Sequence, residues 1–443
     1  MLPSAIALLC CAASATSGGF GQQPARQYAV APSGNDAGPG TLARPWRTIQ
    51  KAADAATPGS TVQIRGGTYH ERVVVHVSGA PGAPITFRNY GSEHVLLDGV
   101  GLGPFTGIAG LLTIDSRSYL SVRGLELAHF HDDADAFVPA GVFVTGTAHD
   151  IALTGLDVHD IRTHAADAHG IAVYGTSGVA PIHDVTIDGN AVHDNKLGSS
   201  ESVVVNGNVR GWRITRNHVY RNDNIGIDAI GFEGKAPRDD QARDGVIADN
   251  LVTDIDTIGN PAYEEDDGNC RCADAIYIDG GKDIVIERNT LLRSNIALEI
   301  ASEHPEGSAA NILARDNLLA DSTSIGLAMG GYDRERGSTV NARVIHNTLR
   351  NNDTLHTGSG EILLQFRVFD SQIIDNVVVA GDQGILMANP YTENAGNVVD
   401  GNDWWTTAAP SWQWKTITYH SFAAYRRGTG NDAHGAFADP RRR

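Results

Sequence analysis

Cysteine is scarce in this sequence. Four cysteines occur among 443 residues, and two of them, Cys10 and Cys11, lie in an apolar N-terminal run. Without that run, Cys270 and Cys272 are the remaining pair, which in an oxidising compartment could form a tight, strained disulfide or stay as two thiols. Two sulfur ligands are too few for a structural zinc site, so none is expected.

Aromatic residues and long apolar runs are also rare. Only 7% of the residues are aromatic and 41% are hydrophobic, whereas glycine occurs 50 times. This composition suits a fold with many turns and thin apolar strands, and it does not suit a helical bundle. Beyond the N-terminus, no apolar stretch is long enough to cross a membrane.

The N-terminus has the pattern of a secretory leader. The apolar run at 2–12 is followed by the small residues Ala13-Ser14-Ala15, which predicts a signal peptide over residues 1–15 with cleavage near Ala15. No Lys or Arg precedes the run, so a misplaced start or a buried terminal strand are the alternatives. We expect a secreted or periplasmic protein.

Positive charge is in deficit. Lysine and arginine number 34 against 52 aspartates and glutamates, which gives a formal net charge of −18. Such a surface repels nucleic acid and anionic lipid, so neither is expected as a partner. It would also repel an acidic polysaccharide unless calcium or a local basic patch intervened.

Asparagine recurs at a spacing that predicts the fold. Seven segments with alternating apolar residues each end in an asparagine, and the asparagines are 27 to 39 residues apart. This period with variable insertions is typical of a β-solenoid, in which stacked amides bond between rungs at a sharp corner. We assign to this structural role Asn190, Asn217, Asn250, Asn289, Asn317, Asn347 and Asn376.

A second set of strands follows these asparagines. Eight segments, from 170–174 to 384–388, carry apolar residues at their second and fourth positions. Because side chains alternate along a strand, the apolar pair should point into the solenoid and the third and fifth residues outward. The fold class is therefore predicted to be all-β, a right-handed parallel β-helix, with repeats over 121–400. The outward positions are mostly small or apolar, namely Ala172, Val204, Ala328, Leu363 and Leu386.

The two ends depart from the repeat. Residues 27–59 suggest a strand, a glycine-rich loop and a short helix from about Trp46 to Ala56, so 27–120 would hold an N-terminal cap and the first rungs. Residues 401–440 contain four of the six tryptophans and a helical stretch at 421–425, which indicate an aromatic C-terminal cap. A carbohydrate-stacking patch is the alternative role for these tryptophans.

Two segments carry a family resemblance. The N-terminal block with GGTYHERV at 66–73, and the closing stretch 421–440, resemble the ends of secreted carbohydrate-active enzymes of the pectate-lyase-like right-handed parallel β-helix superfamily. Their N-terminal segment is often described as a domain of unknown function. The resemblance implies the fold but not the reaction, because the superfamily includes lyases, hydrolases, epimerases and non-catalytic adhesins.

Three carboxylates stand out among the outward positions. Stacking the second strand set puts Asp228, Tyr277 and Glu299 in one outward column, with Asp279 and Asn206 in the next. The Cα of Asp279 would lie about 8 Å from those of Asp228 and Glu299. Glycoside hydrolysis uses two carboxyl groups at such separations, one protonated and one ionised. The alternative is that these acids are simply solvated.

Loops leaving the same strands could form one wall of a groove. We take as candidate substrate-binding residues Asn206, Tyr277, Glu233, Lys282, His304 and Asp333. The insertion 261–272 could lean over the groove, and its acidic run 264–267 either binds calcium or is solvated. His164 and His169, which flank Asp167, are assigned to loop hydrogen bonding in preference to base catalysis.

The leading hypothesis is a monomeric glycoside hydrolase acting on a polysaccharide or oligosaccharide, with Asp228, Asp279 and Glu299 as acid, base or nucleophile. No cofactor is required in this interpretation and no metal ligand is assigned, although calcium could bind. The first alternative is a calcium-dependent polysaccharide lyase. Similarity to the lysine-dependent pectate type would put the expected lysine at Tyr277, which departs from that pattern. The second alternative, a non-catalytic glycan-binding surface protein, would need an aromatic stripe, and aromatics are sparse outside the C-terminal cap.

Overall fold

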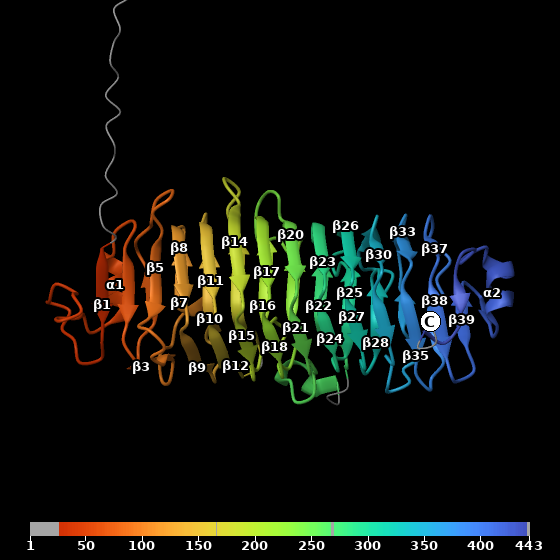
Figure 1. Ribbon diagram of the computed structural model, residues 1–443, viewed down its shortest axis with the longest axis horizontal. Helices are drawn as coiled ribbons and strands as arrows, with labels where there is room; N and C mark the ends of the chain where they lie inside the picture. Colours follow the sequence, from red (N-terminus) through yellow and green to blue (C-terminus); the bar gives the residue numbers. More distant parts are fainter. Residues whose placement is uncertain (1–25, 165, 267–269, 441–443) are drawn as a thin grey trace, which may run out of the picture.

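Three parallel sheets run side by side along the length of the chain (Figure 1). The computed structural model describes residues 26–164, 166–266 and 270–440. In these residues the chain passes from one sheet to the next and returns one rung further along, so it forms a parallel β-helix. The predicted fold class is confirmed.

The first sheet begins with the N-terminal strand and carries most of the asparagine-ended segments. Its strands are β1 (Gln27–Val30), β2 (Thr61–Ile64), β5 (Ile85–Asn89), β8 (Ser118–Arg123), β11 (His149–Thr154), β14 (Ile182–Asp188), β17 (Val209–Thr215), β20 (Arg243–Ala248), β23 (Lys282–Glu287), β26 (Ser308–Arg315), β30 (Arg343–Ile345), β34 (Gln372–Ile374) and β37 (Val398–Asp400), with β29 (Ser338–Val340) and β33 (Val368–Phe369) as a side branch.

The second sheet contains the candidate carboxylates. It is formed by β4 (Val73–Val75), β7 (Ile108–Asp115), β10 (Val138–Thr145), β13 (His169–Gly175), β16 (Val203–Gly207), β19 (Ile227–Ile230), β22 (Asp274–Asp279), β25 (Ile296–Ala301), β28 (Ile325–Met329), β32 (Ile362–Leu364), β36 (Ile385–Asn389), β39 (Ser411–Trp414) and β40 (Ile417–Tyr419).

The third sheet closes the coil. It consists of β3 (Gly67–Tyr69), β6 (Val95–Asp98), β9 (Glu126–Asp132), β12 (Asp157–Thr163), β15 (Ala191–His193), β18 (His218–Tyr220), β21 (Leu251–Thr253), β24 (Thr290–Leu292), β27 (Leu318–Ala320), β31 (Thr348–Arg350), β35 (Val377–Ala380), β38 (Asp403–Thr406) and β41 (Ala436–Phe437).

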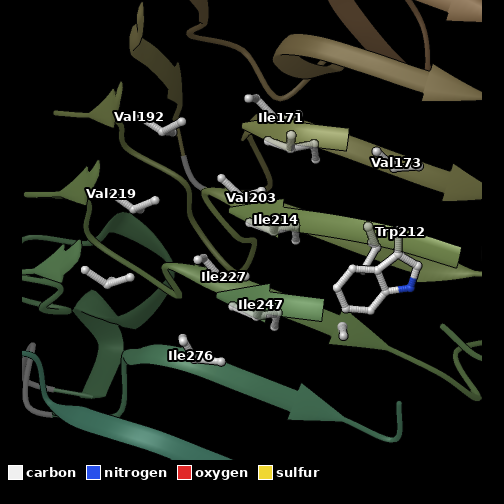
Figure 2. Packing of buried hydrophobic residues seen from close by; sticks show 14 of the residues in the cluster. Ile171, Val173, Val192, Val203, Trp212, Ile214, Val219, Ile227, Ile247 and Ile276 are labelled. Atoms are coloured by element: carbon white, nitrogen blue, oxygen red, sulfur yellow. The ribbon is translucent and has the colours of Figure 1, made fainter. Parts of the chain in front are cut away.

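The core is a stack of inward apolar side chains. In the second sheet, Ile171, Val203, Ile227 and Ile276 are successive Cα partners and lie one above another (Figure 2). Each is fully buried, because the period of two turns every second side chain into the coil. This continuous column is what a solenoid has in place of a globular core.

One large core residue has a glycine as its partner on the next rung. Trp212 points from the first sheet into the interior, and its Cα partner one rung on is Gly245 (Figure 2). A Cβ at Gly245 would lie 2.1 Å from the indole ring of Trp212. Glycine at this position therefore makes room for the ring.

The seven asparagines form one line, as predicted. In each step the backbone N–H and the side-chain Nδ2 of one asparagine donate to Oδ1 of the next, as from Asn217 to Asn250 at 2.9 and 3.0 Å. Nδ2 also donates to a backbone carbonyl of the preceding rung, Ile187 O at 3.0 Å in the case of Asn217. The line continues through Asn402 to Asp432.

Helices lie at both ends of the coil (Figure 1). Helix α1 (Ile49–Ala55) is shorter than predicted, because Thr48 caps it by accepting a bond from Lys51 N. Trp46, expected to open the helix, instead bridges to β1 and stacks on Tyr28 with ring centroids 4.7 Å apart. Helix α2 (Phe422–Thr429) follows the N-cap Ser421.

The C-terminal tryptophans divide into two groups. Trp404 and Trp412 are fully buried and in edge contact with each other. Trp405 and Trp414 are partly exposed. The buried pair therefore cannot stack on a sugar in solvent.

One predicted outward residue is wrong. Leu386 lies in the core, because the pairing of β36 with β39 shifts register between Ile385 and Met387. The open question about the cysteines is also settled, since Cys270 and Cys272 form a disulfide. The predicted signal peptide lies outside the described residues, and within them no helix is long and apolar enough to cross a membrane.

The asparagine line should be a main source of stability. Asn289→Ala removes the Oδ1 that accepts two bonds from Asn250 and the Nδ2 that donates to Ile247 O and Asn317. Because these partners stay buried, we expect a loss of about 3 kcal/mol in the free energy of unfolding, measured by urea denaturation followed by circular dichroism. Asp316→Asn, at the exposed left-handed position next to the line, is the control and should change it by less than about 0.5 kcal/mol. Equal effects of the two substitutions would contradict a structural role for the line.

Candidate functional site

The predicted carboxylate column is present on the second sheet. The Cα partners run Asp228 to Tyr277 to Glu299 on β19, β22 and β25. Asp228 and Glu299 are thus two rungs apart, which corresponds to about 9.6 Å between Cα atoms. Asp279 lies two residues after Tyr277 on the same strand, one rung from each of the other two.

These acids are buried, so the interpretation as solvated surface acids is wrong. The exposed fraction is 1% for Asp228 and 5% for both Asp279 and Glu299. Loops that leave the strands cover them, as shown by the backbone N–H of Glu303, which donates to Asp279 Oδ1 at 2.7 Å. Gly231 N likewise bonds the carbonyl oxygen of Asp279 at 2.8 Å.

Asp274 joins the cluster and was not predicted. Burial and, after it, the charge of Glu299 raise the pKa of the Asp274 carboxyl group, so the two acids lie close together. The period of two misses Asp274, because Ala273, Ala275 and Ile276 all lie in the core, so side chains do not alternate strictly along this stretch. Strict alternation would have placed the side chain of Asp274 inside the coil with that of Ile276.

Glu201 is a fifth buried acid beside these four, and the sequence did not predict it either. It lies just before β16, and one of its oxygens is 3.4 Å from Nδ1 of His169, itself 1% exposed. His169 Nε2 also contacts the hydroxyl of Tyr174 at 3.3 Å. His164, predicted alongside His169, lies elsewhere and pairs with Asp135 at 3.2 Å. We call Glu201, Asp228, Asp274, Asp279 and Glu299 the acid cluster.

Burial and mutual repulsion raise the pKa of every member of the acid cluster. Burial is the main cause, and it raises the pKa of Glu299 to about 8. The pKa values of Asp228, Asp274 and Asp279 lie well above the ordinary value, again through burial and then through neighbouring carboxylates. The cluster therefore holds protons at neutral pH.

An amide and a phenol complete the surroundings of Glu299. The Gln365 amide, with its nitrogen turned toward Gly330 O, donates to Glu299 Oε1 at 3.1 Å. Tyr277 lies between Asp228 and Glu299 in the column, and burial raises the pKa of its hydroxyl well above the usual range. Tyr277 is therefore a neutral neighbour of both acids at physiological pH.

Some predicted binding residues lie at the cluster. Asn206 Nδ2 donates to Glu233 Oε2 at 2.7 Å, and Lys235 pairs with the same oxygen at 3.2 Å. His304 Nε2 lies 4.0 Å from Asp279 Oδ2. These contacts put Asn206, Glu233 and His304 on the side of the cluster where the strands end.

Two other predicted binding residues lie apart from it. Lys282 begins β23 in the first sheet, where its Cα partners are Arg243 and Ala310. Asp333 lies on an exposed turn, accepts bonds from the backbone of Glu335 and Arg336, and pairs with the side chain of Arg336 at 3.5 Å. In the described residues neither side chain contacts a member of the acid cluster.

The insertion before β22 leans over the cluster, as predicted. It contains the 3-10 helix η1 (Pro261–Asp266), anchored by Asn260 Nδ2 on Gly198 O at 2.8 Å. Burial, together with the charges of Glu303, Glu201 and Asp274, raises the pKa of Tyr263 in η1. The side chains of the acidic run 264–267 lie outside what the structure describes.

The acid cluster is not a preformed metal cage. In the described ranges, no three of its members bring ligand atoms within 4.8 Å of one another. Single oxygens of Asp228 and Asp274 are nevertheless buried without a hydrogen-bond partner among these residues. Carboxylate oxygens of this kind are ligands that calcium accepts.

The raised pKa values make a prediction about stability. Acids whose pKa is raised by folding contribute stability that is present below about pH 4 and is lost as pH rises through the folded pKa, about 8 for Glu299. Glu299→Gln and Asp274→Asn remove this repulsion, so at pH 8 each should melt about 3 °C or more above the unsubstituted protein, measured by calorimetry. At pH 4 the gain should vanish. Glu306→Gln, an exposed change in the neighbouring loop, should show no such pH-dependent gain.

Comparisons with known proteins agree with this architecture. A family described as "Pel9A-like, right handed beta helix region" matches residues 28–228. The chain is 39% identical over 415 residues to the uncharacterized protein YwoF of Bacillus subtilis, covering 93% of this chain and 87% of that protein. It is 36% identical over 117 residues to pectate lyase PEL9 of Emericella nidulans, covering 26% and 28% of the two chains.

A solved structure shares the fold at low identity. The GH136 lacto-N-biosidase from Eubacterium ramulus superposes with a TM-score of 0.57 at 15% identity, covering 88% of this chain and 68% of that one. Such a likeness shows the fold and not the reaction. Together with the relatives, it establishes that the chain belongs to the pectate-lyase-like right-handed parallel β-helix superfamily.

Proposed function

We propose that this chain is a secreted or periplasmic enzyme that hydrolyses glycosidic bonds of a polysaccharide at the acid cluster. The observation that carries the proposal is the group of neighbouring acids Asp274, Glu299, Asp228 and Asp279, all buried on the second sheet with raised pKa values. Glycoside hydrolysis needs one carboxyl group that keeps its proton and one that is ionised. A buried group of acids supplies both, because repulsion prevents all of them from ionising together.

The roles follow from position and pKa. Glu299 is proposed as the general acid, since its pKa of about 8 keeps it protonated at neutral pH. Asp274, whose pKa is raised by burial and then by the charge of Glu299, is proposed as a positioning residue for Glu299. The second carboxyl group is proposed from position alone as Asp228 or Asp279, at Cα separations from Glu299 of about 9.6 and 8 Å, and it must give up its proton to act because its pKa is raised as well.

Residues at the ends of the strands would bind the sugar. Asn206, Glu233 and His304 lie beside the cluster, and Tyr277 lies inside it between two acids. A polysaccharide lying along the solenoid axis would meet a new rung about every 4.8 Å, close to the length of one sugar. We propose a monomer, since each chain carries the complete cluster, and no cofactor.

A calcium-dependent lyase is the second candidate. The buried oxygens of Asp228 and Asp274 that lack a hydrogen-bond partner among the described residues favour it, as does the name of the relative PEL9. Against it, Tyr277 stands where the resemblance places the lysine base. The family match also ends at residue 228, before Asp274, Asp279 and Glu299, so the reaction of that family is not transferred by the match.

Amide substitutions test the proposed roles. Asp228→Asn, Asp279→Asn and Glu299→Gln keep side-chain shape but cannot ionise, so the two residues that act as acid and base should each lose at least about a hundredfold in turnover. The substitution of the third carboxylate should reduce turnover by a smaller factor. Activity is measured by screening a polysaccharide panel for reducing ends and for the ultraviolet absorbance of an unsaturated product, which separates hydrolysis from lysis.

The pH profile and a matched control sharpen this test. If Glu299 is the acid, kcat/KM should fall as pH rises through about 8, because the group must keep its proton. Glu306→Gln, in the exposed loop after β25, should match the unsubstituted enzyme in rate and profile. Full activity in all three amide variants would place the reaction elsewhere on the molecule.

Chelation separates the two candidate reactions. Because the acid cluster is not a preformed cage and the proposed acid works through protons, we expect activity to persist in EDTA. The measurement is the rate on the best substrate of the panel before and after chelation. Complete loss in EDTA, restored by calcium and accompanied by an unsaturated product, would support the lyase instead.

A further inference from the structure

Two histidines stack on the outer side of the first sheet, away from the acid cluster. His149 begins β11, and its Cα partner one rung on is His183 in β14. Their imidazole rings are nearly parallel, with an interplanar angle of 3° and centroids 4.8 Å apart. Both side chains are about one-third exposed, so solvent reaches the pair.

The backbone brings a carboxylate to each ring. Asp150 and Asp184 both have left-handed backbone angles, φ 53° and φ 55°, which turn their side chains back toward the preceding histidine. Asp150 Oδ2 lies 2.8 Å from His149 Nδ1, and Asp184 Oδ2 lies 2.7 Å from His183 Nδ1. Carboxylates that orient imidazoles in this way commonly accompany histidines that bind metal.

Three potential ligand atoms converge here. One atom each from His149, Asp150 and His183 lie within 4.8 Å of one another, and in the described part of the chain this is the group that meets this condition. Ligand atoms around a tetrahedral zinc ion are about 3.3 Å apart. Small rotations of these partly exposed side chains would bring the ligand atoms to that spacing.

A second pair of stacked histidines differs in how its ring nitrogens are bonded. His159 and His193 in the third sheet are also stacked, with centroids 5.0 Å apart at 13°. Both nitrogens of His193 are already engaged, Nε2 by Asp157 at 2.9 Å and Nδ1 by Asp194 at 2.6 Å. Among the described residues, the hydrogen bonds of His149 and His183 use only Nδ1.

We propose that His149, Asp150 and His183 form a site for a divalent transition-metal ion such as Zn²⁺, with Asp184 orienting His183. Two imidazoles and one carboxylate are a donor set that zinc prefers and calcium does not. The site would link two successive rungs of the first sheet. It is independent of the proposed hydrolytic reaction, because the acid cluster lies in the second sheet.

Zinc titration of the full chain tests the site. The protein, purified without a histidine tag and freed of metal with EDTA, is titrated with Zn²⁺ at pH 7.5 by isothermal calorimetry. We expect one ion per chain, and a Kd that rises at least about tenfold in His149→Ala, His183→Ala and Asp150→Asn. His193→Ala is the matched control and should bind zinc like the unsubstituted protein.

Thermal melting gives an independent readout. Saturating Zn²⁺ should raise the Tm of the unsubstituted protein and of His193→Ala, and should not raise that of His149→Ala or His183→Ala. If His183→Ala does not fold, His183→Asn retains a polar partner for Asp184 and serves in its place. Unchanged stoichiometry and affinity in the His149 and His183 variants would overturn the proposal. So would the absence of any zinc binding by the unsubstituted chain at about 1 mM zinc.

Discussion

Everything in this molecule depends on the register between successive rungs. Parallel pairing places residues far apart in the sequence directly above one another, as with Asp228, Tyr277 and Glu299. The asparagine line fixes this register at one corner, because each amide bonds both its own kind on the next rung and a carbonyl on the one before. A slip of one residue would turn every outward side chain inward, so the corner also determines where the acids point.

Sequence was sufficient for the fold and for part of the acid cluster. Alternation along a strand and the asparagine period together predict the sheets, the corner and the column containing Asp228 and Glu299. The prediction failed where side chains do not alternate strictly. Ala275 and Ile276 are adjacent and both lie in the core, so alternation misplaces Asp274, and Leu386 lies in the core where the pairing of β36 with β39 shifts register. Burial of the acids was missed for another reason. Burial depends on loops such as the one carrying Glu303, and the repeat spacing does not predict the conformation of these loops.

A solenoid can tolerate a destabilising cluster better than a small globular domain can. Its stability is approximately a sum over rungs and the contacts between neighbouring rungs. Repulsion among the acids on β19, β22 and β25 therefore affects a few rungs, while apolar columns such as Ile171, Val203, Ile227 and Ile276 continue through them. The long regular core therefore compensates for the repulsion among the buried acids on its middle rungs.

The contrast with the other acids of the chain shows why the acid cluster stands out from a general excess of negative charge. At the corners of the coil, aspartates are paired across rungs with arginines, as Asp249 with Arg288 at 2.8 Å and Asp254 with Arg293 at 2.7 Å. Hydrogen bonds from these arginines lower the pKa values of both aspartates.

The acid cluster has the opposite surroundings. Among the described residues no lysine or arginine pairs with Asp228, Asp274, Asp279 or Glu299, and their pKa values are raised. The aspartates at the corners are thus ionised and paired with arginines, whereas the acids of the cluster have no such partners and keep protons. A chain that needed only solubility would gain nothing from burying acids without basic partners, and this is the physical reason for proposing that face as the site of the reaction.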